Sequence, residues 1–361
     1  MIKVLVDLLF YTGKKGGMES YVRHLYAQMP REGFEYTGFA SSELMKLDAS
    51  WFPGSLIDSG ISGENRAAWA WGELNAVARA ARVNASNVIH CPANLGPWRS
   101  RVPVVLTVHD LLPIRHPEFV PGPYAPVLKT LIRAAARTAD VILADSRQTA
   151  TDLREILRIA EHRIEVVPLA GPPAQIEEGK NEVIRESRLL LALGNRLPHK
   201  NFAALLRALA LIPGESRPRL VITGSHGDDP LAPLVASLGL EDSVELRGWL
   251  TDDEMQNLYA RASATVVPTL FEGFGLPVLE AMTRGCPVIC SDIPVLHEVA
   301  GAAALYFDPT SSQAIADAIR TALDSPELLA QLRDGGLARS REFSWELSAQ
   351  RTASALQRAT R

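Results

Sequence analysis

Short runs of apolar, often β-branched residues alternate along the chain with segments that have the 3.6-residue period of an amphipathic helix. The runs predict strands at Ile2–Val6, Val88–His90, Val104–Val108, Val141–Ala144, Leu189–Leu193, Leu220–Thr223, Ser243–Leu246, Ala264–Pro268 and Pro287–Cys290. Helical segments such as Glu19–Met29 and Pro126–Thr138 separate them. Nearly continuous apolar strands that alternate with helices are typical of parallel sheets covered on both faces. Because there are two such series, the sequence predicts an α/β protein with two Rossmann-like domains.

A stretch rich in proline and glycine interrupts the pattern near the middle of the chain. Residues Pro168–Gly179 read PLAGPPAQIEEG, which favours neither helix nor strand. We therefore predict an N-terminal domain over residues 1–168, a linker over 169–186 and a C-terminal domain over 187–343. A last helix is predicted over 344–361.

Composition and charge exclude several classes of protein. The 361 residues include 37 Lys and Arg against 41 Asp and Glu, and the net charge of −4 gives no reason to expect a nucleic-acid partner. Three cysteines, Cys91, Cys286 and Cys290, are too few for a disulfide scaffold, and no His or Cys lies near the C-x3-C pair to complete a zinc site. No apolar run approaches the roughly 20 residues of a membrane span, and the N-terminus, with Asp7 inside it, is interpreted as a strand rather than a signal peptide. We therefore expect a cytoplasmic protein in a reducing compartment.

Three basic residues, Lys129, Arg133 and Arg137, repeat every four positions in a predicted helix and therefore share one face. We interpret this face as solvated. The alternative is a peripheral contact of the N-terminal domain with the inner face of a membrane, or with an anionic acceptor.

The most informative segment is Val266–Asp292, which reads VVPTLFEGFGLPVLEAMTRGCPVICSD. A predicted strand ends near Pro268, and the loop FEGFG follows it. Pro277 suits the first position of the next helix, and Gly285 suits the left-handed position after its last turn. The expected helix has about eight residues, or ~12 Å. In a parallel sheet, a loop that follows a strand lies at the ligand-binding edge.

At the start of this helix, the backbone amides of Phe274, Gly275 and Leu276 would face that edge. The positive end of the helix dipole lies behind them, so the loop predicts an anion site. Gly273 and Gly275 have no side chain to block a close approach.

Two glutamates flank the predicted anion site. Glu272 lies in the loop, and Glu280 follows eight positions later in the helix. Such a spacing is weak in isolation, but here the strand, the glycine-rich loop, the proline and the glycine all agree with it. For Glu280 the alternative is a carboxylate that only stabilises the positive end of the helix.

A basic cluster follows another predicted strand. Residues Leu190–Phe202 read LLALGNRLPHKNF, with a turn at Gly194 and then Arg196, His199 and Lys200 before the next helix. Cations at a strand-to-helix turn suit a diphosphate. The alternative for Lys200 is a solvated position at the start of a helix.

Three features of the N-terminal half lie after predicted strands. Gly13–Glu19 reads GKKGGME, a glycine-rich loop without the Gly-Lys-Ser/Thr ending of a P-loop. His109 directly follows the strand Val104–Val108, where a ligand contact and a structural role are both open. Ser146 offers either a functional hydroxyl or the cap of the following helix.

Together these motifs resemble the donor site of retaining GT-B glycosyltransferases, specifically glycosyltransferase family 4. The resemblance extends over essentially the whole chain. It implies the GT-B fold, in which parallel sheets of two Rossmann-like domains face a central cleft. The N-terminal domain would bind the acceptor, and the C-terminal domain would bind the nucleotide-sugar donor. The helix 344–361 would pack back onto the N-terminal domain.

The resemblance also implies roles for individual residues. Glu272 matches the glutamate beside the transferred sugar, and Glu280 matches the one that binds the ribose hydroxyls. His109 matches a histidine that contacts the sugar. Gly16 and Gly17 match the family's G-G-x-E loop, which approaches the donor phosphates and the acceptor from the opposite domain.

For the diphosphate, Gly194 and Lys200 match a glycine followed six residues later by a lysine. Many members have an arginine directly after the glycine, but here Asn195 takes that position and Arg196 comes one later. Lys200 is therefore the expected phosphate ligand and Arg196 a second candidate. Together with the histidine and the first glutamate named above, Lys200 would form the catalytic set.

The implied reaction moves a sugar from GDP-mannose, a UDP-sugar or dTDP-rhamnose to a glycan, lipid-linked or small-molecule acceptor, with retention of configuration. The sequence contains neither D-x-D nor H-E-x-x-H, so we expect no metal and no cofactor. Three alternatives stay open: a sugar phosphorylase, although the chain is short for one; a nucleotide-sugar epimerase of the same fold; and an inactive nucleotide-sugar-binding subunit.

Overall fold

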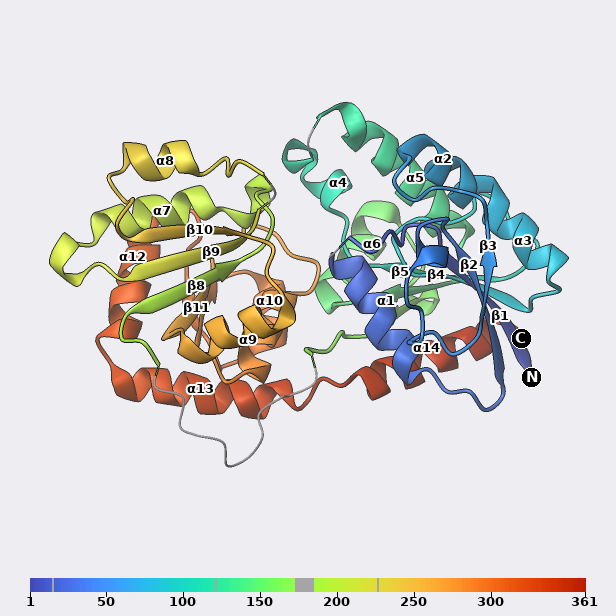
Figure 1. Cartoon of the computed structure of the whole chain (residues 1–361). Helices are drawn as coiled ribbons and strands as arrows, with labels where there is room; N and C mark the ends of the chain where they lie inside the picture. Colours follow the sequence, from blue (N-terminus) through green and yellow to red (C-terminus); the bar gives the residue numbers. More distant parts are fainter. Residues whose placement is uncertain (15, 121, 173–184, 226) are drawn as a thin grey trace. The chain divides into compact units, whose positions relative to one another are not determined.

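A computed structural model of the chain describes residues 1–14, 16–120, 122–172, 185–225 and 227–361 (Figure 1). The chain divides into two units: unit 1 is Met1–Leu169 with Ser344–Arg361, and unit 2 is Ala170–Phe343. Within the described residues, each unit is built on one parallel sheet, which confirms the predicted α/β class with two Rossmann-like domains. Of the predicted linker 169–186, residues 173–184 lie outside the described residues.

Unit 1 has a seven-stranded sheet of order β3-β2-β1-β4-β5-β6-β7. Its strands are β1 (Ile2–Leu8), β2 (Phe34–Ala40), β3 (Ser55–Asp58), β4 (Val88–Cys91), β5 (Val104–Val108), β6 (Val141–Ala144) and β7 (Ile164–Val166). Its helices are α1 (Gly17–Gln28), α2 (Arg66–Trp71), α3 (Val77–Val83), α4 (Leu112–Arg115), α5 (Ala125–Thr138), α6 (Arg147–Leu157) and α14 (Trp345–Ala359), with a π-helical turn, η2 (Gly72–Ala76), between α2 and α3.

Unit 2 has a six-stranded sheet of order β10-β9-β8-β11-β12-β13. Its strands are β8 (Leu189–Leu193), β9 (Arg219–Ser225), β10 (Val244–Gly248), β11 (Ala264–Val267), β12 (Val288–Ser291) and β13 (Leu305–Phe307). Its helices are α7 (Phe202–Leu211), α8 (Ala232–Ser237), α9 (Asp252–Arg261), α10 (Leu276–Thr283), α11 (Pro294–Ala300), α12 (Ser312–Leu323) and α13 (Pro326–Ser340).

The strand orders locate the ligand-binding edge of each sheet. In unit 2 the chain moves outward in one direction from β8 and in the other direction from β11, so the order reverses between these two neighbours. In unit 1 the reversal lies between β1 and β4. Ligands of open parallel sheets bind at the carboxyl ends of the strands beside such a reversal.

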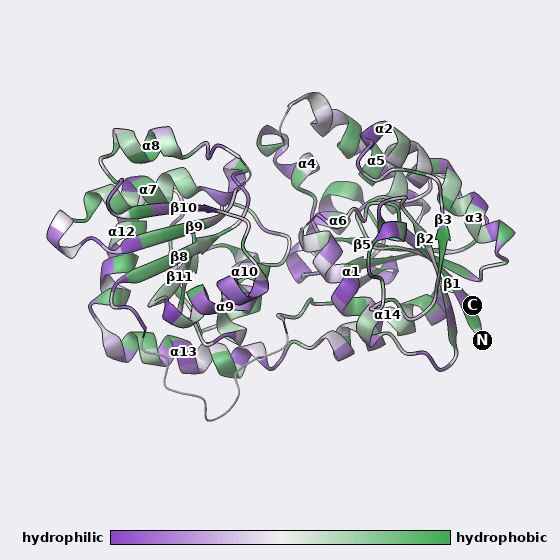
Figure 2. Ribbon diagram, in the orientation of Figure 1, coloured by the Kyte–Doolittle hydropathy of each residue, from purple (hydrophilic) through white to green (hydrophobic). Residues whose placement is uncertain are grey.

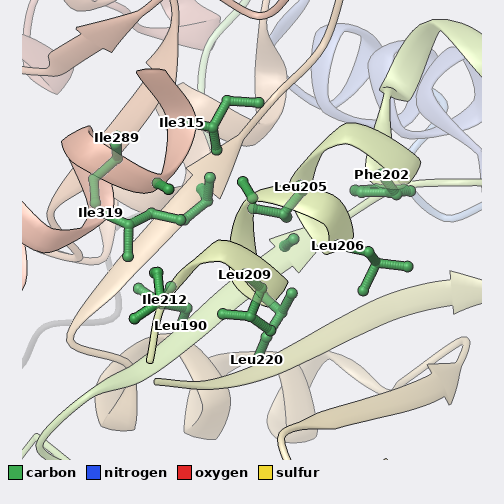
Figure 3. Close-up of a cluster of buried hydrophobic side chains, with 14 of the residues drawn as sticks. Leu190, Phe202, Leu205, Leu206, Leu209, Ile212, Leu220, Ile289, Ile315 and Ile319 are labelled. Atoms are coloured by element: carbon green, nitrogen blue, oxygen red, sulfur yellow. The ribbon is translucent and has the colours of Figure 1, made fainter. Parts of the chain in front are cut away.

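Buried aliphatic side chains fix the helices to the sheets. In unit 2, Leu205 and Leu209 of α7 and Ile315 and Ile319 of α12 share one core with Leu190 of β8 (Figure 3). These side chains are fully or almost fully removed from water, and each contributes roughly 1.5–3 kcal/mol of transfer free energy. The basic turn lies between β8 and the amino end of α7. Because this core fixes both elements, it also holds the turn between them in place.

The C-terminal helix belongs to unit 1. The hydroxyl of Ser344 caps α14 by accepting the N–H of Leu347 at 3.1 Å. Ser348 Oγ donates to the Pro168 carbonyl at 2.6 Å, and the Arg351 guanidinium donates to the Val166 carbonyl at 3.2 Å. The helix also packs on α1, β4, β5 and β6.

The hydropathy of the elements follows their place in each unit. Figure 2 shows strands that are largely hydrophobic and helices in which hydrophilic residues alternate with hydrophobic ones. Among the described residues, no helix combines the length and the apolar character that crossing a membrane requires.

Candidate active site

In unit 2 the loops after β8 and β11 are joined by hydrogen bonds to backbone carbonyls. The carbonyl of His199 accepts the N–H of Leu270 at 2.7 Å and the hydroxyl of Thr269 at 3.0 Å. Asn201, which begins α7 with a left-handed φ of +58°, donates its side-chain amide to the Pro268 carbonyl at 3.0 Å. The two loops at the reversal point of the sheet are therefore one connected structure.

This connection brings Lys200 and Glu272 together. Lys200 Nζ lies 2.7 Å from Glu272 Oε1, and the side chains are only 15% and 11% exposed. Gly194 lies under the lysine, and a Cβ at that glycine would stand 3.5 Å from the Lys200 side-chain carbons. Its φ of +137° is a conformation that favours glycine. The sequence-predicted phosphate ligand and the sugar-side glutamate thus form a charge-assisted hydrogen bond at the expected edge.

The helix after this loop has the predicted length but begins at Leu276, one residue before the predicted start at Pro277. α10 has eight residues, Pro277 lies in its first turn, and Gly285 follows it with φ +64°. Gly275 precedes the helix with φ +107°, and a Cβ there would meet Leu296 at 2.6 Å, so both conformation and space require glycine. Within the described residues, the N–H groups of the loop residue Phe274, Gly275 and Leu276 donate to no acceptor, as expected of an anion-binding helix start.

Glu280 lies in the same helix, close to α9. Its Oε2 accepts the hydroxyl of Tyr259 at 3.3 Å, and the Arg284 guanidinium lies 4.7 Å from the centre of the Tyr259 ring. Burial raises the pKa of the Glu280 carboxyl, against the opposing effects of Arg284 and of the tyrosine hydrogen bond. Among the described residues, Oε1 has no hydrogen-bond partner, so one carboxylate oxygen is open to a ligand.

Arg196 does not take the position of a phosphate ligand. Its guanidinium binds both oxygens of Asp229 and also donates to the carbonyls of Gly194, Thr223 and Ile222. The side chain is only 6% exposed. All N–H groups of the guanidinium are occupied in this way, so Arg196 would have to give up these partners to contact a diphosphate. Its role is to hold the loop after β8 to β9.

In unit 1, His109 lies at the carboxyl end of β5 with both ring nitrogens engaged. Nδ1 is 2.6 Å from Asp145 Oδ2, and Nε2 is 2.9 Å from the Pro92 carbonyl. Its backbone N–H donates to Asn94 Oδ1 at 2.7 Å. Burial opposes the charged form, but the charge and hydrogen bond of Asp145, with help from Asp110, raise the pKa of His109. Both partners are acceptors, so this environment favours the imidazolium over the neutral ring.

Another histidine of unit 1, His90, is fully buried and belongs to a hydrogen-bonded chain of side chains. His90 Nδ1 is 2.6 Å from the Tyr26 hydroxyl, and Nε2 is 3.0 Å from Thr107 Oγ1. The Thr107 hydroxyl is in turn 3.1 Å from the Tyr21 hydroxyl. Burial and the neighbouring charge of His109 lower the pKa of His90 to about 3, so this ring is neutral.

The glycine loop of unit 1 is closed by Glu19, whose Oε1 accepts the N–H of Thr12 at 2.8 Å and its hydroxyl at 3.1 Å. Gly16 precedes α1 in an extended conformation, and Gly17 is the first residue of the helix. A Cβ at Gly17 would have no atom within 4 Å, and one at Gly16 only a carbonyl oxygen at 4.0 Å. The fold of unit 1 therefore does not require either glycine.

Ser146 is a helix cap. Its Oγ accepts the N–H of Thr149 at 3.0 Å at the start of α6, which supports the structural alternative for this residue. Sequence reasoning missed Asp145 and Tyr259. Asp145 directly follows β6 at the ligand edge, a signal that could have found it. Tyr259 lies in the middle of α9 and has no such signal.

The edge of unit 2 offers one ammonium group, the amides of a helix start and two carboxylates. This set can hold a polyanion next to a group that gains positive charge. Among the described residues, no three His, Cys, Asp or Glu side chains are grouped so that they could hold a metal ion. In unit 1, the corresponding edge offers the ring of His109 and a glycine loop with free space at Gly16 and Gly17.

Comparison with known proteins gives consistent matches in both halves of the chain. The family model of glycosyl transferases group 1 matches residues 174–339, and that of Glycosyltransferase Family 4 matches residues 15–170. The O-antigen chain mannosyltransferase B of Escherichia coli is 34% identical over 256 residues, which cover 67% of each chain.

Two further similarities extend this result. The chain is 30% identical over 276 residues to the serotype-specific mannosyltransferase WbdA of Escherichia coli; the match covers 72% of this chain and only 33% of that longer protein. The sucrose-phosphate synthase of Thermosynechococcus elongatus has a similar structure, with a TM-score of 0.78 at 20% identity over 99% of both chains. The chain therefore belongs to the glycosyltransferases of family 4, which have the GT-B fold.

Proposed function

We propose that this enzyme transfers a hexosyl group from a nucleoside-diphosphate sugar to a hydroxyl of a glycan acceptor, with retention of configuration and without a divalent metal. The observation that carries the proposal is the Lys200–Glu272 pair beside the open amides of α10. It combines a cation and a helix start for the leaving diphosphate with a carboxylate for the sugar. Unit 2 would bind the donor, and unit 1 would bind the acceptor.

The leaving group defines the first task of the site. A departing nucleoside diphosphate gains negative charge in the transition state, and prearranged donors stabilise that charge most effectively in a water-poor site. Lys200 is 15% exposed, so its ammonium meets this requirement. The N–H groups of Gly275 and Leu276 would add the partial positive charge of a helix start.

The two glutamates would serve different parts of the donor. Glu280 has one open oxygen and a second that is fixed by Tyr259, which suits an acceptor of ribose hydroxyl hydrogens. Glu272 accepts a hydrogen bond from Lys200. When the diphosphate takes over the ammonium group, the carboxylate of Glu272 becomes available to the sugar, where positive charge develops.

In unit 1, His109 would position the sugar. Its Nε2–H is bound to the Pro92 carbonyl, and a sugar hydroxyl would replace that carbonyl as acceptor. Asp145 keeps the ring oriented through Nδ1 during the exchange. The open space at Gly16 and Gly17 would admit donor phosphates or acceptor.

The relatives favour mannose as the transferred sugar. Two of them, at 34% and 30% identity, are named as mannosyltransferases, and one of the two as an enzyme of the O-antigen chain. We therefore propose a mannosyl donor and a growing polysaccharide as acceptor. Contact of α5 with a membrane stays a prediction. Lys129, Arg133 and Arg137 lie on that helix as expected.

A nucleotide screen followed by product analysis tests the proposal. In a thermal-shift assay, the matching nucleoside diphosphate at about 100 times its dissociation constant adds roughly 2.7 kcal/mol to the free energy of unfolding. GDP, UDP and dTDP are compared, with Glu280→Ala as the control that should lose the shift. NMR of the product from the matching mannosyl donor should show the anomeric configuration of the donor.

Two results would overturn the proposal. A product with inverted configuration contradicts retention. Conversion of the nucleotide sugar in the absence of any acceptor, without release of nucleoside diphosphate, assigns the epimerase alternative instead.

A further inference from the structure

A basic pocket lies in unit 1 away from the strand ends that carry His109. It has a volume of about 560 Å³ and lies between α3 and the segment 98–101. α3 ends at Val83 before β4, and the segment 98–101 precedes β5. The pocket is therefore near the amino ends of these strands, whereas ligands of open parallel sheets bind at the carboxyl ends.

Four arginines line this pocket. Arg79 and Arg82 come from α3, and Arg99 and Arg101 come from the segment before β5. Arg82 lies in the last turn of α3, where it also complements the helix dipole, but the other three have no such role. No acidic residue lines the pocket.

The charges of these arginines are not compensated. Within the described residues, none of the four guanidinium groups forms an ion pair or a hydrogen bond, in contrast to Arg196 in unit 2. Asp140, two residues after the lining residue Thr138, accepts the N–H of Val104 at 2.8 Å and is not part of the lining. All four arginines are exposed. Solvent screens their mutual repulsion in part, and a bound anion would reduce it further.

We propose that this pocket binds a diphosphate group, at a site distinct from the donor site. Guanidinium groups bind phosphate oxygens in pairs, and two segments that supply two arginines each can hold two adjacent phosphates. Trp98 is 57% exposed at the rim, and the Arg99 guanidinium lies 5.6 Å from the centre of its ring. The indole face offers a surface for the organic part of the ligand. The volume is in the range of small-molecule sites.

Inorganic pyrophosphate is the probe for the test, and its binding is measured by calorimetry. Orthophosphate, measured in the same way, is the comparison ligand. Pyrophosphate also suits the donor site, so binding is measured in a Lys200→Ala background. There, pyrophosphate should bind more tightly than orthophosphate, and Arg79→Ala with Arg101→Ala should weaken its binding at least about tenfold. Arg31→Ala removes the same charge from an exposed position outside the pocket and should leave affinity unchanged.

Tryptophan fluorescence assigns the binding to this pocket. Pyrophosphate should change the emission, and Trp98→Phe should abolish the change while calorimetry still reports binding. Equal affinity in the arginine variants and the Arg31→Ala control would overturn the proposal, as would an emission change that survives Trp98→Phe.

The source of the diphosphate is decided by two further probes. GDP or UDP represents a soluble nucleotide, and farnesyl diphosphate in phosphatidylcholine vesicles represents a lipid headgroup. If the ligand is a soluble nucleotide, GDP or UDP should bind saturably, and the arginine substitutions should weaken that binding. If the ligand is a lipid headgroup, the protein should co-sediment with the vesicles. This co-sedimentation should require both farnesyl diphosphate and the arginines. Binding to vesicles of phosphatidylserine without any diphosphate, equally in all variants, would contradict a diphosphate site.

Discussion

The ammonium group of Lys200 lies 2.7 Å from Glu272 Oε1, although the two residues are 72 positions apart in the sequence. Each belongs to a loop at the reversal point of the unit 2 sheet. Both charges are mostly buried, so each depends on the other until a ligand takes its place. In the proposed reaction, the donor exchanges this internal partner for its own diphosphate and sugar.

Lys200→Ala should lower kcat about a hundredfold, or roughly 3 kcal/mol, because one cation that faces the leaving diphosphate is lost. A solvated lysine at the start of a helix, the alternative that the sequence left open, could be removed with little change in stability. The structure changes this expectation, since Glu272 would keep a mostly buried and unpaired carboxylate. Loss of about 1–3 kcal/mol in the free energy of unfolding is expected.

A double-mutant cycle separates the two effects. Glu272→Ala added to Lys200→Ala should restore part of the lost stability but none of the activity. A coupling energy below about 0.5 kcal/mol would show that the ion pair does not exist in solution. Turnover of Lys200→Ala within about threefold of wild type would show that Lys200 does not serve the leaving group.

Removal of the two glutamates should have different kinetic consequences. Glu280→Ala should raise KM and weaken binding of the free nucleoside diphosphate, since ribose contacts act equally in the ground state and the transition state. Each hydrogen bond to a charged group is worth roughly 1.5–3 kcal/mol, so loss of two could exceed a hundredfold in affinity. Glu272→Ala should lower kcat with little effect on nucleotide affinity.

Calorimetry with the nucleoside diphosphate, beside steady-state rates, checks this difference. Tyr259→Phe is the matched control for Glu280, because it removes the hydrogen bond to Oε2 and leaves the carboxylate. It should weaken nucleotide binding less than Glu280→Ala does. Weak nucleotide binding by Glu272→Ala together with normal binding by Glu280→Ala would reverse the assignment.

Local patterns were sufficient for the framework of the site. β5, β6 and β8 have the bounds that the apolar runs predict, because strands buried on both faces have a continuous apolar sequence. α10 and Gly285 follow from turn chemistry between neighbours in the sequence. The strands that the pattern did not mark include β7 and β13, which have three residues each and lie at sheet edges. So few residues carry no readable period.

Local sequence patterns could not predict which charged side chains pair with one another. Arg196 and Lys200 lie in one loop with the same charge, and the sequence made both candidates for the diphosphate. Their roles separate only because Asp229 and Glu272, from two different loops, reach one of them each. Such choices depend on how strands are ordered in the sheet, which local sequence does not specify.

Transfer should proceed at full rate in excess EDTA. The charge on the leaving diphosphate is met in this proposal by Lys200 and the amides that begin α10, and the sequence has no D-x-D motif. The assay compares EDTA with added magnesium and manganese on the same preparation. Loss of nearly all activity in EDTA, with recovery on adding a metal, would refute metal independence.

Two histidines of unit 1 should respond to pH in opposite directions. His90 has a pKa lowered to about 3 by burial and by His109, against an ordinary value of 6.5. Below about pH 6.5 the unfolded chain binds a proton that the folded chain does not, so this group removes up to about 1.4 kcal/mol of stability per pH unit. The pKa of His109 is raised, so its contribution is complete below 6.5 and is lost as pH rises through the folded value.

The difference between wild type and His90→Gln isolates the first effect. Other buried groups of unit 1 with raised pKa values, such as Glu73, also make stability depend on pH, but they contribute equally to both proteins. The slope of unfolding free energy against pH between about 6 and 4 should be smaller in the variant by up to about 1.4 kcal/mol per pH unit. NMR should show one imidazole that stays neutral above pH 4 and is absent from His90→Gln. Equal slopes would mean that His90 is protonated in the folded protein.

A pair of glycine substitutions distinguishes a glycine needed by a ligand from one needed by the fold. Gly17 is the first residue of α1, and a Cβ there would have no atom within 4 Å. Gly17→Ala should therefore keep or raise the free energy of unfolding, by up to about 1 kcal/mol, since alanine favours the helix. If donor phosphates or acceptor approach this backbone, the added methyl group lowers kcat/KM at least about tenfold.

Gly275→Ala is the contrast. Its φ of +107° opposes a side chain, and an added Cβ would stand only 2.6 Å from Leu296. It should lower stability and activity together, by more than about 1 kcal/mol in unfolding free energy. Thermal unfolding and steady-state kinetics on the two variants give the result. A Gly17→Ala enzyme that is as active as wild type would show that no ligand passes the glycine loop, and an unstable one would show that the fold needs the glycine after all.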